Sequence, residues 1–405
     1  MTLIEDLGRA CEVREPGPGD AIDGVSPQVV ARPDSTAETA ALLRACHERD
    51  LAVTVRGAGT KSSWGAPPTR VDVVVETSAM DRLVEHAHGD LIATAGAGMP
   101  LADLNATLAE RDQQLLVDDP VGGGTLGGLL AANVSGARRM VPGALRDLLI
   151  GVTMVRADGT VAKSGGKVVK NVAGYDLGKL LVGSYGTLAV ITEVTFRLHP
   201  VPPAARWTQA PVPADRLAET LAAVLHSQLV PAAVEVDRAA GGTADTTVGV
   251  LVTGTEGGVE SRAAALSEML PGARISEDLG WTGRFPWLDG NGTSAVAVKM
   301  TSRLSGVPEL VAQASGAGVH VRGSAGVGVL YGSLPAGQGA PATVETLRAT
   351  CAALGGSLVV LDAPAATKAR LDVWGPVTGL DLMRRVKHEF DPTGVLSPGR
   401  FVGGI

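Results

Sequence analysis

The chain has 405 residues, 45% of them hydrophobic and 19% charged, and a formal net charge of −7. This apolar fraction predicts folded structure, in two or three domains at about 100–200 residues each, and excludes wholesale disorder. The acidic balance argues against a nucleic-acid-binding face, and the 53 glycines follow no G-X-Y period, which excludes collagen.

The cysteines and the N-terminus indicate the compartment. Cys11, Cys46 and Cys351 are too far apart to form a metal-ligand motif, and their odd number does not suit a disulfide framework. The N-terminal residues include Glu5 and Asp6 and lack the apolar stretch of a secretory signal. No run of about 18 apolar residues predicts a membrane span. We therefore expect a cytoplasmic protein, one that a partner can hold at the inner face of the membrane.

The first half of the chain alternates helix and strand signals. Residues 1–27 are rich in Pro, Gly and acids and are predicted to form an arm. A helix is predicted to begin near Ser35, with Glu38 three residues on as a capping box. Apolar strands follow at 51–55 and 71–76. Helix, strand, loop and strand in this order favour an α/β unit with parallel strands.

Farther along, a helix is predicted at 100–110, a hairpin turn at Asp158-Gly159 and a strand at 191–200. A Pro-rich joint then leads into mixed helix and strand signals. The expected domains are an arm at 1–27, an α/β domain at 28–200, a smaller α+β domain at 205–345 and a C-terminal segment at 346–405.

Two glycine loops carry the strongest site signals. The first, Arg56-Gly57-Ala58-Gly59-Thr60-Lys61, leaves a predicted strand, and its glycines allow backbone N–H groups to converge on an anion such as a pyrophosphate. The second, Gly122 to Gly128, leads into a helix whose backbone a ring or a phosphate could approach. Either loop alone is explained equally well as a tight turn in a Gly-rich chain. The second loop matches the G-x-G-x-x-G spacing, but no βαβ unit of about 30 residues surrounds it, so we reject a Rossmann site.

Three motifs in order and a matching tail carry a family resemblance. RGAGTKSSWG (56–65), DDPVGGGTLGGLLAANVSG (118–136) and VVKNVAGYDLGKLLVGSYGTLAVITEVTFRLHPVP (168–202) resemble the PCMH-type FAD-binding domain of the vanillyl-alcohol oxidase superfamily. FDPTGVLSPGRF (390–401) resembles the C-terminal signature of the D-lactate dehydrogenase and glycolate oxidase branch, most of all its smaller, E-type flavin subunit. The resemblance implies an α/β plus α+β fold, with a two-part FAD-binding domain and a smaller cap domain.

The resemblance also implies the residues that hold FAD. The first loop would cradle the pyrophosphate, the second would lie along the pyrophosphate and isoalloxazine, and a later segment would hold the adenosine half. The implied residues are Arg56, Gly57, Ala58, Gly59, Thr60, Lys61, Pro120, Gly124, Thr125, Gly127, Gly128, Ser135, Gly136, Gly186, Thr187 and Ile191. Relatives with covalent FAD use a His or Cys near the first loop; none lies between Cys46 and His86, so we expect non-covalent FAD.

Two catalytic motifs of the substrate-oxidising relatives are missing. The stretch Val321–Val329 lacks their Gly-Asp-Gly-Asn-x-His pattern, and Asp372–Pro376 stands where they carry Glu-His-Gly, which serves a metal and the substrate. His320 and Arg322 alternate on one predicted strand and are weak candidates for substrate contact, although structural roles are the more common for such residues. We predict no metal site and no assigned catalytic residue.

The resemblance implies a FAD-binding subunit of a glycolate (2-hydroxy acid) oxidase complex. Its partners would be a larger catalytic flavin subunit and an iron–sulfur subunit, because this chain has no cysteine cluster for iron–sulfur centres. The alternatives are a self-sufficient FAD oxidoreductase in which Arg322, His320 or Lys299 takes the substrate, and a flavin-free scaffold.

Overall fold

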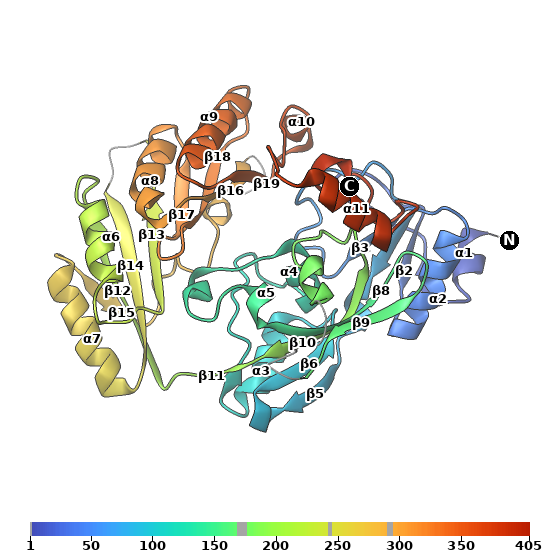
Figure 1. Ribbon diagram of the computed structural model, residues 1–405, viewed down its shortest axis with the longest axis horizontal. Coiled ribbons are helices and arrows are strands. Elements are labelled where there is room, and N and C mark those ends of the chain that lie inside the picture. The colour runs from blue at the N-terminus through green and yellow to red at the C-terminus, as the bar shows by residue number, and fades with distance from the viewer. Residues whose placement is uncertain (1, 168–175, 242–244, 290–294) are drawn as a thin grey trace. The chain divides into compact units, whose positions relative to one another are not determined.

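The computed structural model in Figure 1 describes residues 2–167, 176–241, 245–289 and 295–405. The chain forms two compact units. Unit 1 comprises Met1–Val134, Ala144–Pro200 and Pro376–Ile405, and unit 2 comprises Ser135–Gly143 and Val201–Gly375. The segment 168–175 of the third sequence motif lies outside the described residues.

Unit 1 begins with a mostly parallel four-stranded sheet in the order β1-β2-β4-β3. Strands β3 and β4 are parallel, as predicted; β2, which was not predicted, is parallel to β4, and β1 is antiparallel to β2. The strands are buried because their side chains are almost all apolar, as is usual where parallel strands are covered on both faces. The bounds are β1 (Glu12–Arg14), β2 (Val29–Arg32), β3 (Val53–Arg56), β4 (Val73–Glu76), α1 (Leu3–Leu7) and α2 (Thr36–His47).

The predicted cap of α2 is present: the Ser35 hydroxyl accepts a hydrogen bond from the Glu38 N–H at 3.3 Å.

Residues 1–27 differ from the expected arm. Thr2 caps α1, Leu7 is fully buried, and β1 extends the parallel sheet. The Pro- and Gly-rich composition that suggested an arm is concentrated between Glu15 and Asp20, after these elements.

A second, antiparallel sheet of unit 1 has the order β5-β6-β10-β8-β9. The predicted turn at Asp158-Gly159 joins β8 to β9, and Gly159 has φ +80°, which a hairpin of this kind requires. The bounds are β5 (Leu83–Ala87), β6 (Ile92–Gly96), β8 (Leu149–Val155), β9 (Val161–Gly165), β10 (Val190–Arg197), the pair β7 (Gln113–Gln114) and β11 (His199–Pro200), and the helices α3 (Leu101–Ala109), α4 (Leu126–Ala132) and α5 (Leu145–Leu148).

The C-terminus returns to unit 1 through α11 (Leu380–Phe390). Beyond this helix, the Val53 N–H donates to Val395 O at 2.8 Å and the Ser397 N–H donates to Val53 O at 2.7 Å. The tail thus lies alongside β3, pairing in parallel through Leu396. Buried Lys387 holds this arrangement by donating to Thr187 O (2.8 Å), Leu396 O (2.9 Å) and Asp391 (2.6 Å).

Unit 2 is an eight-stranded antiparallel sheet in the order β15-β12-β14-β13-β17-β18-β16-β19. Helices α6 to α9 cover one face (Figure 1), where alternate strand residues such as Val298 and Val321 join helix residues in a single core. The bounds are β12 (Ala204–Val212), α6 (Leu217–Leu225), β13 (Ala233–Arg238), β14 (Thr246–Gly254), α7 (Glu256–Met269), β15 (Arg274–Ser276), β16 (Ala295–Thr301), α8 (Val307–Gly316), β17 (His320–Ser324), β18 (Val329–Pro335), α9 (Ala340–Ala353), β19 (Leu358–Asp362) and α10 (Ala365–Lys368).

The predicted class, α/β plus α+β, is confirmed by these two units. The C-terminal segment, expected to return to the first domain from 346, does so only from Pro376. The reason is strand pairing: β19 adds to β16 at the edge of the unit 2 sheet, and α9 packs in the unit 2 core.

Replacement of Lys387 by Met should lower the free energy of unfolding by about 3–5 kcal/mol, because Asp391 would stay buried without its cation. Urea titration followed by circular dichroism measures the loss. The matched control on the same helix is Arg384→Met, whose ion pair with Asp381 is exposed, with an expected effect below about 0.5 kcal/mol. Equal losses for the two variants would contradict this assignment.

Candidate functional site

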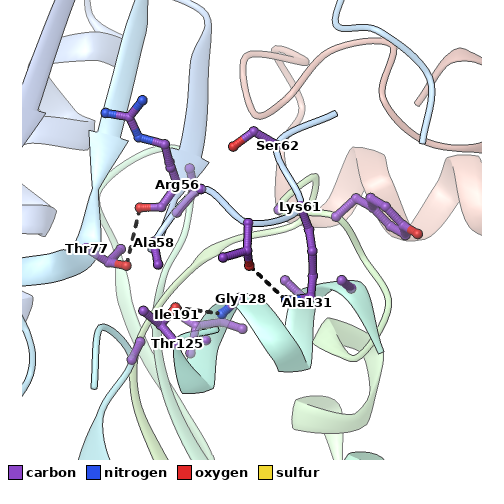
Figure 2. A pocket seen from close by; sticks show the side chains of 18 of the residues that line it. Arg56, Ala58, Lys61, Ser62, Thr77, Thr125, Gly128, Ala131 and Ile191 are labelled. Atoms are coloured by element: carbon purple, nitrogen blue, oxygen red, sulfur yellow. Dashed lines mark hydrogen bonds between the residues drawn. The ribbon is translucent and has the colours of Figure 1, made fainter. Parts of the chain in front are cut away.

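A pocket in unit 1 lies where β3 ends and α4 begins (Figure 2). It brings together the first loop, the start of α4 and the segment around Gly186. Most of the predicted FAD residues line it, namely Arg56, Gly57, Ala58, Gly59, Thr60, Lys61, Gly124, Thr125, Gly127, Gly128, Gly186 and Ile191.

The first loop presents a run of unused backbone donors to this pocket. The N–H groups of Ala58, Gly59, Thr60 and Lys61 donate to no acceptor among the described residues. Gly59 has φ +78°, a left-handed conformation that turns successive N–H groups toward one side. Ala58 is exposed and the other three residues are half-buried, so these donors are open to an external anion.

The start of α4 uses its donors differently. The N–H groups of Leu126 and Gly127 donate to Met99 O and Ala97 O, and the Gly128 N–H donates to the Thr125 hydroxyl. Because these N–H groups already have acceptors within the chain, the start of α4 lines the pocket without offering free donors to an anion. The anion donors are therefore those of the first loop.

Two glycines permit the close packing of these walls. A Cβ at Gly57 would lie 2.1 Å from Thr125 Oγ1, so the first loop can touch the α4 cap only without a side chain. A Cβ at Gly127 would lie 2.9 Å from the Ala97 Cβ and 3.0 Å from its carbonyl oxygen. Gly127 is thus required by the packing of α4 against the chain after β6, and it also lines the pocket where the resemblance implies a flavin contact.

The Arg56 side chain is committed elsewhere. Its guanidinium donates to Asp20 at 2.6 Å and to Glu76 at 2.7 Å, and Figure 2 shows it directed away from Lys61. Burial acts to lower the pKa of Arg56, but these two carboxylates raise it above its ordinary value. Arg56 contributes backbone to the pocket, and its charge is neutralised by the acids.

Lys61 is the cation that lies over the pocket. Its Nζ donates to Thr60 Oγ1 at 2.8 Å and pairs with Asp119 at 3.3 Å, and Figure 2 shows the side chain extended toward Ala131 on α4. Burial lowers the pKa of Lys61, and Asp119 offsets part of that effect. Asp119 also accepts from the Gly124 N–H at 2.6 Å, so this ion pair joins the two glycine loops.

The pocket includes residues that sequence reasoning missed. Arg400 reaches the first loop from the C-terminal tail and donates to Ser62 O (2.9 Å) and Trp64 O (2.6 Å). Tyr185 lies before Gly186 in a left-handed conformation with φ +55°. The available signal for Arg400 was its place in the tail motif, but only the fold brings it to a loop more than 300 residues earlier.

Four predicted FAD residues do not line this pocket: Pro120, Ser135, Gly136 and Thr187. Thr187 is buried, and its hydroxyl donates to Ser184 O at 2.7 Å, which shapes the turn around Gly186. Ser135 and Gly136 belong to the segment of unit 2 that follows α4.

The predicted substrate residues lie on β17 in unit 2 and share a partner. His320 Nε2 lies 2.8 Å from Asp237 Oδ1, and the Arg322 Nε donates to the same oxygen at 2.7 Å. Arg322 also donates to Asp289 at 2.5 Å. Two carboxylates thus neutralise Arg322, which indicates a structural role and leaves little attraction for a substrate carboxylate. Within the described ranges, no cluster of three or more His, Cys, Asp or Glu is suited to hold a metal.

The pocket fits a dinucleotide's diphosphate. The diphosphate is an anion that backbone N–H groups bind well, and Lys61 supplies a nearby positive charge. The small side chains at Ala97, Ala131 and Ala132 leave the walls open to a long ligand.

Burial raises the thiol pKa values of Cys11 and Cys46 to about 11 and about 12, so neither is a thiolate at neutral pH.

Two glycine substitutions should act in different ways. Gly57→Ala should weaken FAD binding at least tenfold, because the first loop must move off Thr125, whereas Gly127→Val should cost about 1–3 kcal/mol of stability by overpacking against Ala97. FAD titration by fluorescence and thermal unfolding of the apoprotein separate the two effects. Gly89→Ala, in open space, is the control. Unchanged FAD affinity in a folded Gly57→Ala protein would contradict the placement.

Replacement of Lys61 by Met should weaken FAD binding about 10–100-fold, the effect of one hydrogen bond to a charged group. Added salt should reduce the difference between variant and wild type. The control is Lys163→Met, at an exposed position on β9. A variant that binds FAD as tightly as the wild type would show that Lys61 serves only Asp119.

Comparison with known proteins agrees with this reading of unit 1. Residues 27–165 match the family model described as "FAD binding domain". The chain is 35% identical over 209 residues to D-lactate dehydrogenase of Archaeoglobus fulgidus, an alignment that covers 49% of this chain and 47% of the relative. It is 33% identical to glycolate oxidase subunit GlcE of Escherichia coli (44% and 50% covered) and 32% identical to subunit GlcD of Bacillus subtilis (52% and 45%). The chain spans about half the length of these relatives.

Solved structures extend the likeness to the whole fold. P-cresol methylhydroxylase superposes with a TM-score of 0.71 over 98% of this chain and 92% of its own, at 16% identity. Alkyldihydroxyacetonephosphate synthase gives a TM-score of 0.67 over 98% and 83%. Residues 27–165 thus match a FAD-binding domain, and the chain as a whole has the mixed α/β and antiparallel-sheet fold of these solved structures.

Proposed function

We propose that this chain binds FAD non-covalently in unit 1 and takes part in the oxidation of a 2-hydroxy acid such as glycolate. The observation that carries the proposal is the run of unused N–H groups from Ala58 to Lys61, which lines a pocket formed mostly by the segment that matches a FAD-binding domain. D-lactate dehydrogenase and glycolate oxidase subunits among the relatives support the substrate class.

Bound FAD would supply the acceptor for the hydride of the C–H bond, and the hydroxyl proton would pass to water, so that the hydroxy acid becomes a 2-oxo acid. The residues of this chain would bind and orient it. The first loop and Lys61 would hold the diphosphate, and Gly186 and Ile191 would line the same pocket. The Arg56 ion pairs with Asp20 and Glu76 would keep the loop in place when the pocket is empty.

We propose further that the chain works as the smaller flavin subunit of a complex, beside a larger catalytic flavin subunit and an iron–sulfur subunit. The stretch at Asp372–Pro376 supports this role. Asp372 Oδ1 accepts from the Trp374 and Gly375 N–H groups, and its carbonyl oxygen accepts from Arg348 at 2.6 Å. This stretch is a turn pinned to α9, without the Glu and His that serve a metal in the substrate-oxidising pattern.

The same assignment favours a cytoplasmic location at the inner face of the membrane, through the partners. The three cysteines are buried free thiols, which suits a reducing compartment. No helix within the described residues is long and apolar enough to cross a membrane.

A second candidate function is a self-sufficient FAD oxidoreductase. It is favoured by one observation: Lys299 on β16 of unit 2 has no carboxylate partner among the described residues, which leaves its charge available to an acid.

Purification of the chain alone and together with the two proposed partners tests the proposal. We expect the chain alone to carry flavin that acid precipitation releases, and anaerobic glycolate or D-lactate to bleach the flavin of the complex. Colourless protein that FAD cannot reconstitute would overturn the proposal in favour of a scaffold. Bleaching of the chain without partners would favour the self-sufficient enzyme.

A further inference from the structure

The first loop is held by a part of the C-terminal tail that we call the tail segment, residues 395–401. The Arg400 guanidinium donates to Ser62 O at 2.9 Å and to Trp64 O at 2.6 Å. The Ser62 N–H donates back to Gly59 O at 3.2 Å, so these carbonyl groups belong to the turn that closes the loop. A guanidinium is a rigid planar fork, and its binding to two carbonyl oxygens fixes their relative positions. Arg400 therefore fixes the end of the loop.

The tail segment also contacts a second wall of the pocket, the turn around Gly186. A Cβ at Gly186 would lie 3.3 Å from the Ser397 Oγ. The ring centroids of Phe401 and Tyr185 lie 6.2 Å apart. Ser397 and Tyr185 both have left-handed backbone conformations, with φ of +43° and +55°. Such conformations persist only where the surrounding structure holds them, so this wall depends on where the tail segment lies.

Backbone contacts join the tail segment to unit 1 outside the pocket. The Ser397 N–H donates to Val53 O at 2.7 Å. The Thr69 N–H donates to Pro398 O at 2.8 Å. Gly399 has φ +85°, and a Cβ there would lie 2.6 Å from Thr69 Cγ2, so only glycine allows this approach. Gly399 does not line the pocket, and its substitution would displace the tail segment without altering the pocket surface.

Arg400 itself lines the pocket, so two roles toward a diphosphate must be compared. The guanidinium could pair with the phosphates, or it could hold the loop whose N–H groups bind them. Both of its terminal nitrogens already donate to carbonyl oxygens, and Arg400 is only 5% exposed, which favours the second role. Added salt separates the two roles, because it weakens the attraction between a cation and a phosphate more than hydrogen bonds to neutral carbonyl groups.

We propose that docking of the tail segment is coupled to FAD binding, with Arg400 as a positioning residue for the loop that binds the diphosphate. This inference rests on the proposed function, because it requires FAD in the unit 1 pocket. Linkage makes the coupling reciprocal: a docked tail segment strengthens FAD binding, and bound FAD strengthens docking by the same factor. The tail segment is then a latch, and any event that loosens it releases the cofactor.

FAD affinity of purified variants, measured by fluorescence titration, tests the latch. We expect Arg400→Met and Gly399→Ala each to weaken FAD binding by about tenfold or more, with Arg400→Lys retaining part of the affinity. The matched control is Gly394→Ala. Gly394 also has a left-handed conformation, with φ +68°, but a Cβ there meets nothing within 4 Å, so this variant should bind FAD as the wild type does. Circular dichroism of the apoproteins establishes that each variant is folded.

Hydrogen exchange of the wild-type protein, with and without FAD, measures the reciprocal effect. The reporters are the Ser397 and Thr69 N–H groups, which donate across the contact between the tail segment and the rest of unit 1. The control is the Gly159 N–H, which donates to Arg156 O in the turn between β8 and β9. We expect FAD to slow exchange at the two reporters more than at Gly159.

Loss of FAD affinity in Arg400→Met and Gly399→Ala at low and high salt, with slowed exchange at the reporters, supports the latch. Equal affinity in folded Gly399→Ala and Gly394→Ala, or reporter exchange that FAD does not change, overturns it. If only Arg400→Met binds weakly and added salt removes its deficit, Arg400 is a direct ligand and the positioning role is wrong.

These outcomes are distinct from those of the proposed function. If the latch is supported but no 2-hydroxy acid reduces the flavin of the complex, the latch stands and the proposed substrate class fails. If 2-hydroxy acids bleach the flavin while Gly399→Ala keeps full affinity, only the latch fails. Wild-type protein that binds no FAD overturns both.

Discussion

The run of backbone N–H groups left without partners at the end of β3 is the constraint on which unit 1 depends. Such a turn is unstable by itself, because unpaired donors lose their hydrogen bonds to water when a pocket closes over them. The surrounding structure therefore holds it from several sides. The C-terminal tail lies alongside β3, Arg400 binds two carbonyl oxygens of the loop, and Thr125 touches Gly57 across the pocket. The C-terminal tail and the cap of α4 thus both contact this part of the chain, and the tail also adds Val395 and Leu396 to the core.

The cationic side chains of this molecule differ in how many carboxylates they pair with. Arg56 and Arg322 are paired with two carboxylates each, and these networks order loops and strands. Lys61, in contrast, has one acidic partner at 3.3 Å. Lys299 has no carboxylate partner among the described residues. Cations whose charge is less compensated attract anions more strongly, because desolvated charges lower their energy most by pairing. We therefore expect anions to bind near Lys61 and Lys299. Arg56 and Arg322 were also candidates from the sequence, but their charges are already neutralised.

The arrangement of local elements could be predicted because local rules decide it. The cap at Ser35, the hairpin at Asp158-Gly159 and the parallel strands after α2 all follow from side-chain chemistry over a few residues. Predictions that depended on composition were weaker. Residues 1–27 contain a capped helix and a strand, because Leu7 finds a buried position that only the rest of unit 1 provides. Gly127 belongs to a motif, but its role became clear only from Ala97, thirty residues earlier, which packs against it.

The sequence by itself determined the fold class, the segment that matches a FAD-binding domain and the position of the loop for which we propose diphosphate binding, because glycine spacing and strand signals act over short distances. Only the tertiary structure decided which charged groups are available. Asp237 lies 85 residues before Arg322 and neutralises it, whereas Lys299 on β16 of the same sheet has no carboxylate partner among the described residues. Ion pairing of this kind depends on distances between side chains in the folded chain. No spacing rule along the sequence contains those distances, and so the sequence alone could not separate a structural arginine from one that binds a ligand.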